Sequence, residues 1–174
     1  TSRSVFFANE YLQIDLGGIA KGYAVDRSIH ILQGLGVQHA TVSAGGDSRI
    51  LGDKRGEPWS VGIKNPRGKG EGQDGVALVL PMIDGAISTS GDYERFFLNK
   101  SGERIHHILS PKTGRPVKGI QSVSVIGPEA IMTDGLSTAL FVLGLEKGIT
   151  LINSFEYFDV VMIDDGGKVH FSDG

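Results

Sequence analysis

Residues 131–144, IMTDGLSTALFVLG, form a largely apolar stretch that constrains the fold of this chain more than any other segment. Pro128, just before it, occupies a position typical of the first residue of a helix. The preceding run IQSVSVIG, residues 120–127, is typical of a strand. A helix with so much apolar surface is expected to pack on a neighbouring element, so the pair predicts an α+β fold.

Short strands account for most of the remaining chain. They are predicted at 11–16, 39–46, 47–52, 58–66 and 76–82, in two runs within 86–109 joined by a turn at 99–102, and in a closing hairpin within 158–172 that turns at 165–167. A helix is predicted from Lys21 to Leu35, ended by Gly34 and Gly36, and a shorter one at 145–155. The Gly-rich stretch 67–75 is interpreted as a surface loop. Since no repeat or linker divides the chain, we expect one domain spanning residues 1–174.

Composition excludes several classes of protein. The chain has 174 residues, 40% of them hydrophobic, which is enough to bury a core without metal staples. Its 17 basic and 20 acidic residues are spread along the sequence, so no nucleic-acid partner is expected. No apolar run is long enough to span a bilayer, and the polar start lacks the pattern of a signal peptide. Without cysteine, disulfides, thiolate zinc sites and cysteine nucleophiles are excluded.

Three oxygen-bearing residues of the apolar helix form a candidate metal site. Asp134, Ser137 and Thr138 stand at i, i+3 and i+4, which places their side chains on one helical face. One carboxylate with two hydroxyls suits a hard cation and leaves positions open for phosphate, as magnesium sites usually do. The other interpretation is a helix whose polar residues face solvent or bond back to the preceding turn.

Two glycine-containing motifs could bind an anion or a cation. DLGGIAKG, residues 15–22, stands where a strand is expected to lead into a helix, so its backbone amides could hold a phosphate and its carbonyls a cation. It is neither a dinucleotide fingerprint nor a Walker loop, and a plain helix start with a surface lysine explains it as well. SAGGDSR, residues 43–49, is equally open to a tight turn or a ligand contact.

The adjacent histidines His106 and His107 close the predicted hairpin. Successive side chains of a strand point to opposite faces, so at most one of them faces a given pocket. A neutral imidazole beside a hydroxyl could act as a general base, although a purely structural histidine is the other interpretation.

Taken together and in order, four blocks resemble the ApbE family of FAD:protein FMN transferases. They are DLGGIAKGYAVD (15–26), SAGGDSRILG with PWSVGIKNP (43–66), AISTSGDYERFF with RIHHILSPKTGRPV (86–117) and SVSVIGPEAIMTDGLSTALFVLG (122–144). The resemblance covers nearly the whole chain. It implies an ApbE-like, T-fold-like α+β domain with a mixed, largely antiparallel sheet and helices packed on it.

The resemblance also implies an activity and a set of site residues. Members of the family use Mg²⁺ and FAD, release AMP and attach FMN to a threonine or serine of a target protein. Asp15, Lys21 and Ile108 match positions that contact FAD, and His107 matches the histidine that activates the acceptor hydroxyl. The residues that match metal-binding positions are Gly18 through its carbonyl, Asp134 and Thr138, with Ser137 beside them at a variable position.

Other activities and the cellular context stay open at this point. Family members have a further N-terminal region, which we expect this chain to lack, so an incomplete half-site or a noncatalytic FAD-binding module is one alternative. An FAD pyrophosphatase giving FMN and AMP is another. The resemblance implies acceptors such as subunits of membrane redox-driven complexes, and a periplasmic location through an N-terminal lipid anchor outside these residues.

Overall fold

A six-stranded antiparallel sheet is the centre of the fold in the computed structural model, which describes residues 3–68 and 75–173. Its strand order is β1-β2-β5-β8-β9-β10, and every neighbouring pair is antiparallel. The strands are β1 (Ala40–Ala44), β2 (Asp47–Leu51), β5 (Gly85–Gly91), β8 (Ile120–Gly127), β9 (Asp159–Asp164) and β10 (Val169–Phe171). This confirms the expected α+β class and its largely antiparallel sheet.

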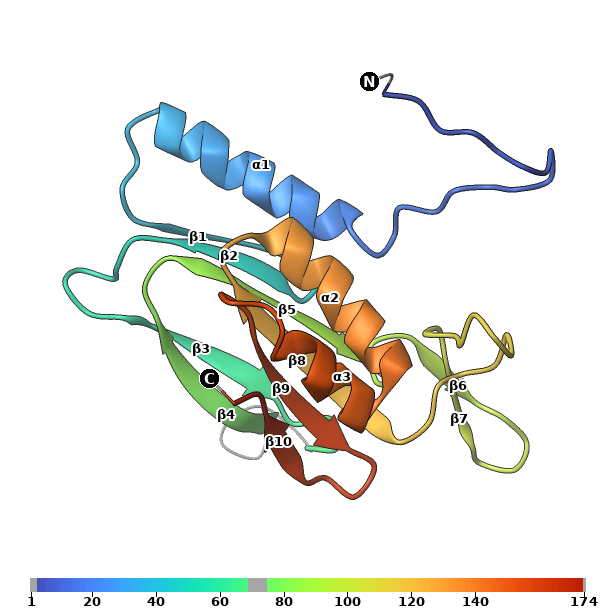
Figure 1. Cartoon of the computed structure of the whole chain (residues 1–174). Helices are drawn as coiled ribbons and strands as arrows, with labels where there is room; N and C mark the ends of the chain where they lie inside the picture. The colour runs from blue at the N-terminus through green and yellow to red at the C-terminus, as the bar shows by residue number, and fades with distance from the viewer. Residues whose placement is uncertain (1–2, 69–74, 174) are drawn as a thin grey trace.

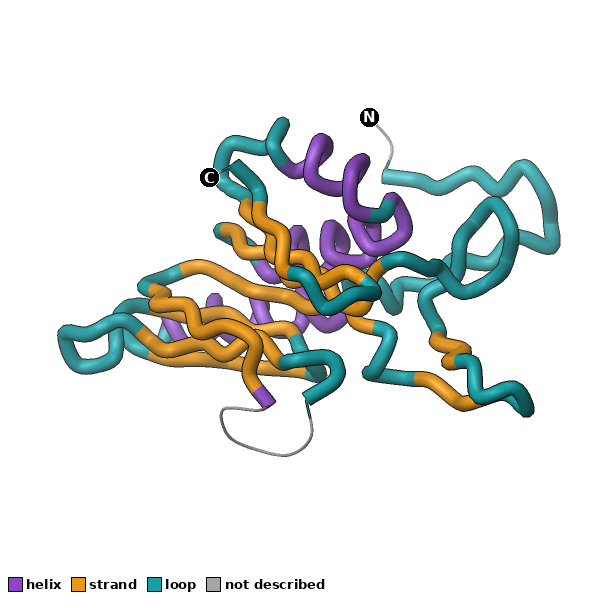
Figure 2. Tube along the Cα trace, turned by 90° about the horizontal axis from the view of Figure 1, so that it is seen from below, coloured by secondary structure: helices purple, strands orange, loops and turns teal. Residues whose placement is uncertain are grey.

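Three helices cover one face of this sheet: α1 (Ala20–Gly34), α2 (Ala130–Leu143) and α3 (Leu145–Ile152) (Figure 1). A two-stranded ribbon, β3 (Trp59–Lys64) with β4 (Val76–Met82), packs on the other face (Figure 2). The central strand β8 is therefore buried on both sides. Val123 and Val125 pack under the helices, whereas Ile126 contacts the apolar cluster beneath the ribbon.

Two segments project from this body (Figure 1). The first is the N-terminal segment 3–19, which precedes α1 and has no helix or strand. The second is a hairpin of β6 (Phe96–Leu98) and β7 (Arg104–His106), joined through a turn at 99–103 and placed beyond the C-terminal end of α2. The predicted hairpin that ends on the paired histidines is thus confirmed.

The strand predicted at residues 11–16 is wrong. These residues form a turn and an irregular stretch, and Tyr11 and Leu12 are exposed. Alternating apolar residues form a strand only where a second strand accepts their backbone hydrogen bonds, and no described segment pairs with this one. Of the predicted loop 67–75, residues 69–74 lie outside the described residues.

Helix α2 begins at Ala130, so the expectation that Pro128 is its first residue is also wrong. The physical reason lies in α1. The carboxylate of Asp26 accepts hydrogen bonds from the backbone N–H groups of Ala130 (2.9 Å) and Ile131 (2.8 Å), and Asp26 also pairs with Arg49 of β2 at 2.8 Å. A carboxylate from another helix thus satisfies the free amides at the start of α2 and sets where it begins.

The two long helices approach most closely at Gly22 of α1. A β-carbon placed on Gly22 would lie 2.2 Å from the carbonyl oxygen of Ala130, whereas one on Gly34, at the exposed end of the same helix, would meet nothing within 4 Å. Both glycines have backbone dihedrals that alanine can adopt. Only a residue without a side chain therefore lets α1 and α2 pack at this distance.

Replacing Gly22 with alanine is expected to lower the free energy of unfolding by about 1–3 kcal/mol or more, because the backbone of α2 must move to admit the methyl group. The matched control Gly34→Ala should leave the stability unchanged or raise it by up to about 1 kcal/mol, since alanine favours a helix over glycine. Urea unfolding of both variants measures the difference. Equal stability of the two variants would contradict the close packing at Gly22.

Candidate active site

A cluster of one partly exposed lysine and two buried aspartates lies where α1, α2 and β2 meet. Lys21 follows the first residue of α1, and its Nζ donates to Asp134 Oδ1 of α2 at 3.0 Å and lies 2.9 Å from Asp47 Oδ2 of β2. Asp134 Oδ2 accepts the backbone N–H of Gly22 at 3.0 Å. The close packing of the two helices is therefore what brings Lys21 to a carboxylate 113 residues away in the sequence.

The electrostatics of this cluster favour a charged lysine. Partial burial would lower the pKa of Lys21, but hydrogen bonds and the charges of Asp47 and Asp134 outweigh it and raise the pKa above its ordinary 10.5. Burial raises the pKa of Asp47 above 3.8, and contacts with Lys21 and Ser88 offset this only in part. Two carboxylates facing one ammonium leave an excess of negative charge when both are ionised, which favours a further cation.

Gly18 and Asp15 precede this cluster in the chain, and they differ in what they contact. The Gly18 carbonyl oxygen would lie 3.9 Å from a β-carbon on Gly135, the residue after Asp134, so this oxygen lies against α2. Asp15 is exposed, and its Oδ1 accepts the N–H of Gly17 at 2.6 Å. No described contact joins Asp15 to Lys21 or Asp134.

The hydroxyls of Ser137 and Thr138 meet a third hydroxyl, from Ser90 of β5. Ser90 Oγ lies 2.8 Å from Ser137 Oγ and 3.1 Å from Thr138 Oγ1. Ser137 is buried and also donates to the backbone carbonyl of Asp134 at 2.9 Å, whereas Thr138 is half-buried. Ser137 thus already has two partners, which leaves Thr138 as the better-placed hydroxyl of the pair for a ligand.

The two histidines differ in what their ring nitrogens contact. His106 is buried edge-on against Phe141 of α2, with ring centroids 5.6 Å apart. Its Nε2 lies 2.8 Å from the Val117 carbonyl oxygen, and its Nδ1 accepts the N–H of Ile108 at 3.3 Å. A carbonyl only accepts, so the proton must be on Nε2, and both nitrogens are engaged. His106 is therefore a structural residue.

His107, one residue later, faces solvent. Its Nδ1 lies 3.2 Å from the carbonyl oxygen of Arg95, which again only accepts, so the proton is on Nδ1 and the lone pair is on Nε2. No described residue bonds to Nε2. This is the tautomer that a general base requires. Ile108 is buried in the main core cluster, and its carbonyl accepts the N–H of Val117.

The structure thus brings together some of the predicted residues and not others. Lys21 contacts Asp134, Gly18 faces the neighbour of Asp134, and Ser137 and Thr138 share Ser90. Among the described residues, no hydrogen bond joins His107 or Asp15 to this group. Sequence reasoning missed Asp47 and Ser90. Asp47 is the acidic residue of the glycine motif 43–49, so the sequence offered a signal for it. Nothing in the sequence singled out Ser90.

The donor set fits a hard divalent cation. Asp47 Oδ2 is buried and lies 2.9 Å from the Lys21 ammonium, which uses one of its two lone pairs, and each oxygen of Asp134 likewise uses one of its two. With the Gly18 carbonyl and the Thr138 hydroxyl, these are the all-oxygen ligands that Mg²⁺ accepts. Within the described ranges, no group of three His, Cys, Asp or Glu side chains offers a competing metal site.

The fold and the site define an antiparallel α+β domain with a partly buried lysine–aspartate cluster, three neighbouring hydroxyls and a solvent-facing histidine. The family model described as "ApbE family" matches residues 2–162, and this chain belongs to that family.

Named relatives support this assignment. The chain is 38% identical over 181 residues to the FAD:protein FMN transferase of Treponema pallidum, covering 98% of this chain and 49% of that protein. It is 36% identical to the enzyme of the same name from Rhodobacter capsulatus, covering 97% of this chain and 31% of that protein. The chain spans about half the length of these curated relatives or less.

Solved structures agree with the fold. The ApbE protein from Thermotoga maritima superposes with a TM-score of 0.84 at 42% identity, covering 92% of this chain and 52% of that one. The flavin transferase ApbE from Vibrio cholerae superposes with a TM-score of 0.77 at 35% identity, covering 92% and 50%. Among the described residues, no helix has both the length and the apolar character needed to cross a bilayer.

Proposed function

We propose that this chain carries the site of an FAD:protein FMN transferase, which cleaves FAD, releases AMP and attaches FMN through a phosphoester bond to a threonine or serine of a target protein. The observation that carries the proposal is the contact of Lys21 with Asp134 at 3.0 Å. These residues come from two separate blocks of the family resemblance and match positions for FAD and metal. Relatives that share 36–38% identity carry the same name.

Mg²⁺ is the proposed cofactor of this site. Asp134, Thr138 and the carbonyl of Gly18 would hold it, and Ser137 would keep Thr138 in place through Ser90. When bound, the ion supplies positive charge that stabilises the negative charge developing on a pyrophosphate. Lys21, held against both carboxylates, would contact the phosphates of FAD, with Asp15 and Ile108 completing the proposed flavin site.

The protein's own residues account for the proton transfer. The acceptor hydroxyl oxygen attacks the phosphorus on the FMN side of the pyrophosphate, and the bond from that phosphorus to the AMP oxygen breaks. The hydroxyl proton passes to His107 Nε2, whose lone pair is free because Nδ1 carries the ring proton. AMP leaves with the electron pair of the broken bond.

The proposed cellular context follows the family. An acceptor such as a subunit of a membrane redox-driven complex, and a periplasmic location through an N-terminal lipid anchor outside these residues, belong to this proposal. They rest on the resemblance alone.

The direct test is to incubate the protein with FAD, MgCl₂ and synthetic peptides that each contain one threonine or serine. We expect AMP release together with peptide that carries covalent flavin fluorescence, and loss of both products when EDTA removes the metal. FMN and AMP without labelled peptide would point to an FAD pyrophosphatase instead. FAD binding without any product would identify a noncatalytic module or a half-site that needs further residues.

A further inference from the structure

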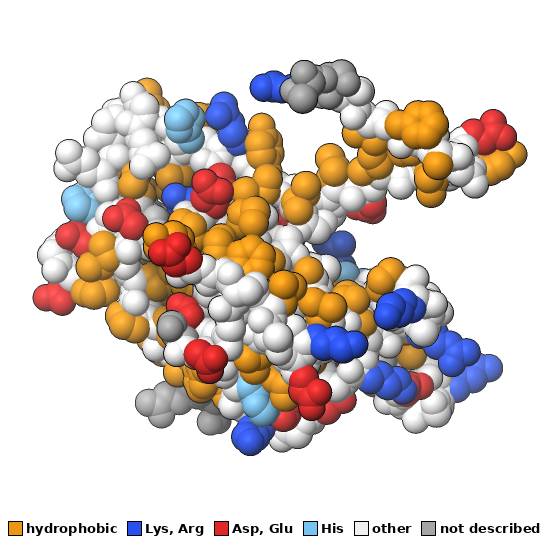
Figure 3. Space-filling model, viewed as in Figure 1, with side chains coloured by type: hydrophobic (Ala, Val, Ile, Leu, Met, Phe, Trp, Pro, Cys, Tyr) orange, Lys and Arg blue, Asp and Glu red, His pale blue; other side chains and the backbone are white. Residues whose placement is uncertain are grey.

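The hairpin and the turn that follows it carry an excess of positive charge. We call residues 95–118 the basic arm, which comprises β6, β7 and the turn 110–115. It contains six lysines and arginines and one glutamate, hence a net charge of +5, in a chain whose overall net charge is −3. Lys and Arg side chains gather on this projection in the space-filling view (Figure 3). The rest of the chain is correspondingly acidic.

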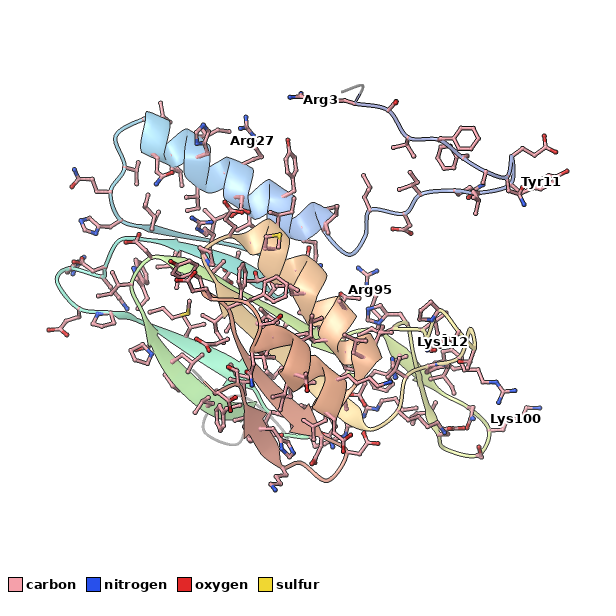
Figure 4. The ribbon with its side chains drawn as sticks, in the orientation of Figure 1. Arg3, Tyr11, Arg27, Arg95, Lys100 and Lys112 are labelled. Carbon is pink, nitrogen blue, oxygen red and sulfur yellow. The ribbon has the colours of Figure 1, made fainter. Side chains whose placement is uncertain are left out.

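Most of these cations have no internal partner. Lys118 pairs with Glu103 at the surface, and Arg104 lies 3.8 Å from Asp92. No described carboxylate pairs with the remaining four, which are all exposed: Arg95, Lys100, Lys112 and Arg115. Figure 4 shows Lys100 at the far tip of the arm, with Arg95 and Lys112 nearer the body of the domain. The free charges therefore extend along the whole arm.

Strand register sorts the side chains of the arm into two faces. Phe96 pairs with His106 and Phe97 with Ile105, and the N–H of His107 donates to the Arg95 carbonyl. Paired residues of antiparallel strands share a face, and neighbours along a strand alternate. Arg95, Phe97 and His107 consequently share the face opposite to buried His106. On this outward face Phe97 is 63% exposed.

The root of the arm is held in place, so this face has a defined geometry. Asp92, buried at the end of β5, accepts both terminal nitrogens of Arg67 at 2.8 and 2.6 Å. Arg104 lies over the ring of Phe96 at 3.9 Å, and His106 packs against Phe141 of α2. His106 thus connects the arm to α2, and Arg104, 3.8 Å from Asp92, connects it to the end of β5 and, through Asp92, to Arg67 in the loop after β3. A partner would thus meet a preorganised surface.

We propose that the outward face of the basic arm docks the acceptor protein, through an acidic segment that flanks the hydroxyl to be modified. This inference rests on the proposed transferase function. Free cations select a negatively charged partner, and exposed Phe97 offers an apolar anchor between them. The face also carries His107, so a segment bound along it presents its hydroxyl beside the base. Lys100, at the tip, extends the contact beyond the flavin site.

A binding assay tests the docking face without any chemistry. The probes are a rhodamine-labelled 13-residue peptide with a central threonine flanked by aspartates and glutamates, and the same peptide with asparagines and glutamines. Anisotropy at low salt should show the acidic peptide binding roughly tenfold tighter, with the difference shrinking as salt is added. The double variant Arg95→Gln/Lys100→Gln should weaken it by roughly 3- to 20-fold. Arg27→Gln/Lys147→Gln, which removes two exposed cations outside the arm, is the matched control.

Three results would overturn the proposal. These are equal affinity for both peptides, equal losses in the arm and control variants, and loss of FAD binding rather than peptide binding in the arm variant. Arm-dependent binding to phosphatidylglycerol vesicles without peptide binding would instead identify a membrane-facing element. Labelling assays separate this inference from the transferase itself. Arm-dependent peptide binding with no FMN transfer would remove the proposed function and leave the docking face standing.

Discussion

Replacing His107 with alanine is expected to slow FMN transfer to a peptide threonine by roughly 100- to 10,000-fold, the range typical for loss of a general base. The reason is the tautomer fixed by the Arg95 carbonyl, which leaves Nε2 as the proton acceptor. FAD affinity and thermal stability should change little, because the ring is exposed and makes one side-chain hydrogen bond. Transfer rates with saturating FAD, together with FAD calorimetry, measure both effects.

His106→Ala is the informative comparison for this variant. Its ring is buried with both nitrogens bonded, so we expect lower stability and a displaced arm rather than loss of a base. Thermal unfolding distinguishes the two roles, since only His106→Ala should lower the melting temperature. If His107→Ala transferred FMN within tenfold of the wild type, the assignment of this residue as base would be wrong.

Replacing Asp134 with asparagine is expected to reduce transfer by roughly 100- to 1,000-fold, because a divalent cation contributes several kcal/mol to a transition state and each 1.36 kcal/mol is a factor of ten. The amide oxygen can still accept the N–H of Gly22, so the helices should remain packed. The substitution removes the negative charge of Asp134, which attracts both the Lys21 ammonium and the proposed ion. Transfer rates across a MgCl₂ titration should show a much higher requirement for the metal.

Asp159→Asn controls for the general effect of removing a carboxylate. Asp159 is exposed and accepts a hydrogen bond from the hydroxyl of Ser172 at 2.9 Å, outside the candidate site. The Asp159→Asn variant should retain the wild-type rate of FMN transfer and the wild-type magnesium dependence. An Asp134→Asn variant with an unchanged magnesium requirement would exclude this carboxylate as a metal ligand.

Local patterns were enough to predict most of the fold. Alternation predicted a strand within 58–66, and the structure has β3 there, with Trp59, Val61 and Ile63 less exposed than the residues between them. The strand 120–127 and the helices after it follow from apolar content. These features depend on near neighbours in the sequence. The start of α2 depends on Asp26, about a hundred residues earlier, and no local pattern could reveal that cap.

The candidate site shows the same limit. Helical spacing placed Asp134 near Ser137 and Thr138, but it could not show that Ser137 bonds back to Asp134 while Thr138 stays accessible. The contact between Lys21, Asp47 and Asp134 joins three elements and exists only after folding. The tautomers of His106 and His107 depend on which carbonyl faces each ring. The residue types indicated the chemistry, and tertiary contacts decided which residues can perform it.

The cap that Asp26 provides also limits how the site can move. Helix α1 is attached to the first turns of α2 at two points: Asp26 accepts two capping bonds at the start of α2, and Gly22 and Lys21 both donate to the carboxylate of Asp134. Sliding or rotating α2 by one residue would break all of them together. We therefore expect α1 and α2 to move as one rigid body, which leaves adjustment to a bound ligand to the N-terminal segment 3–19, where there is no helix or strand.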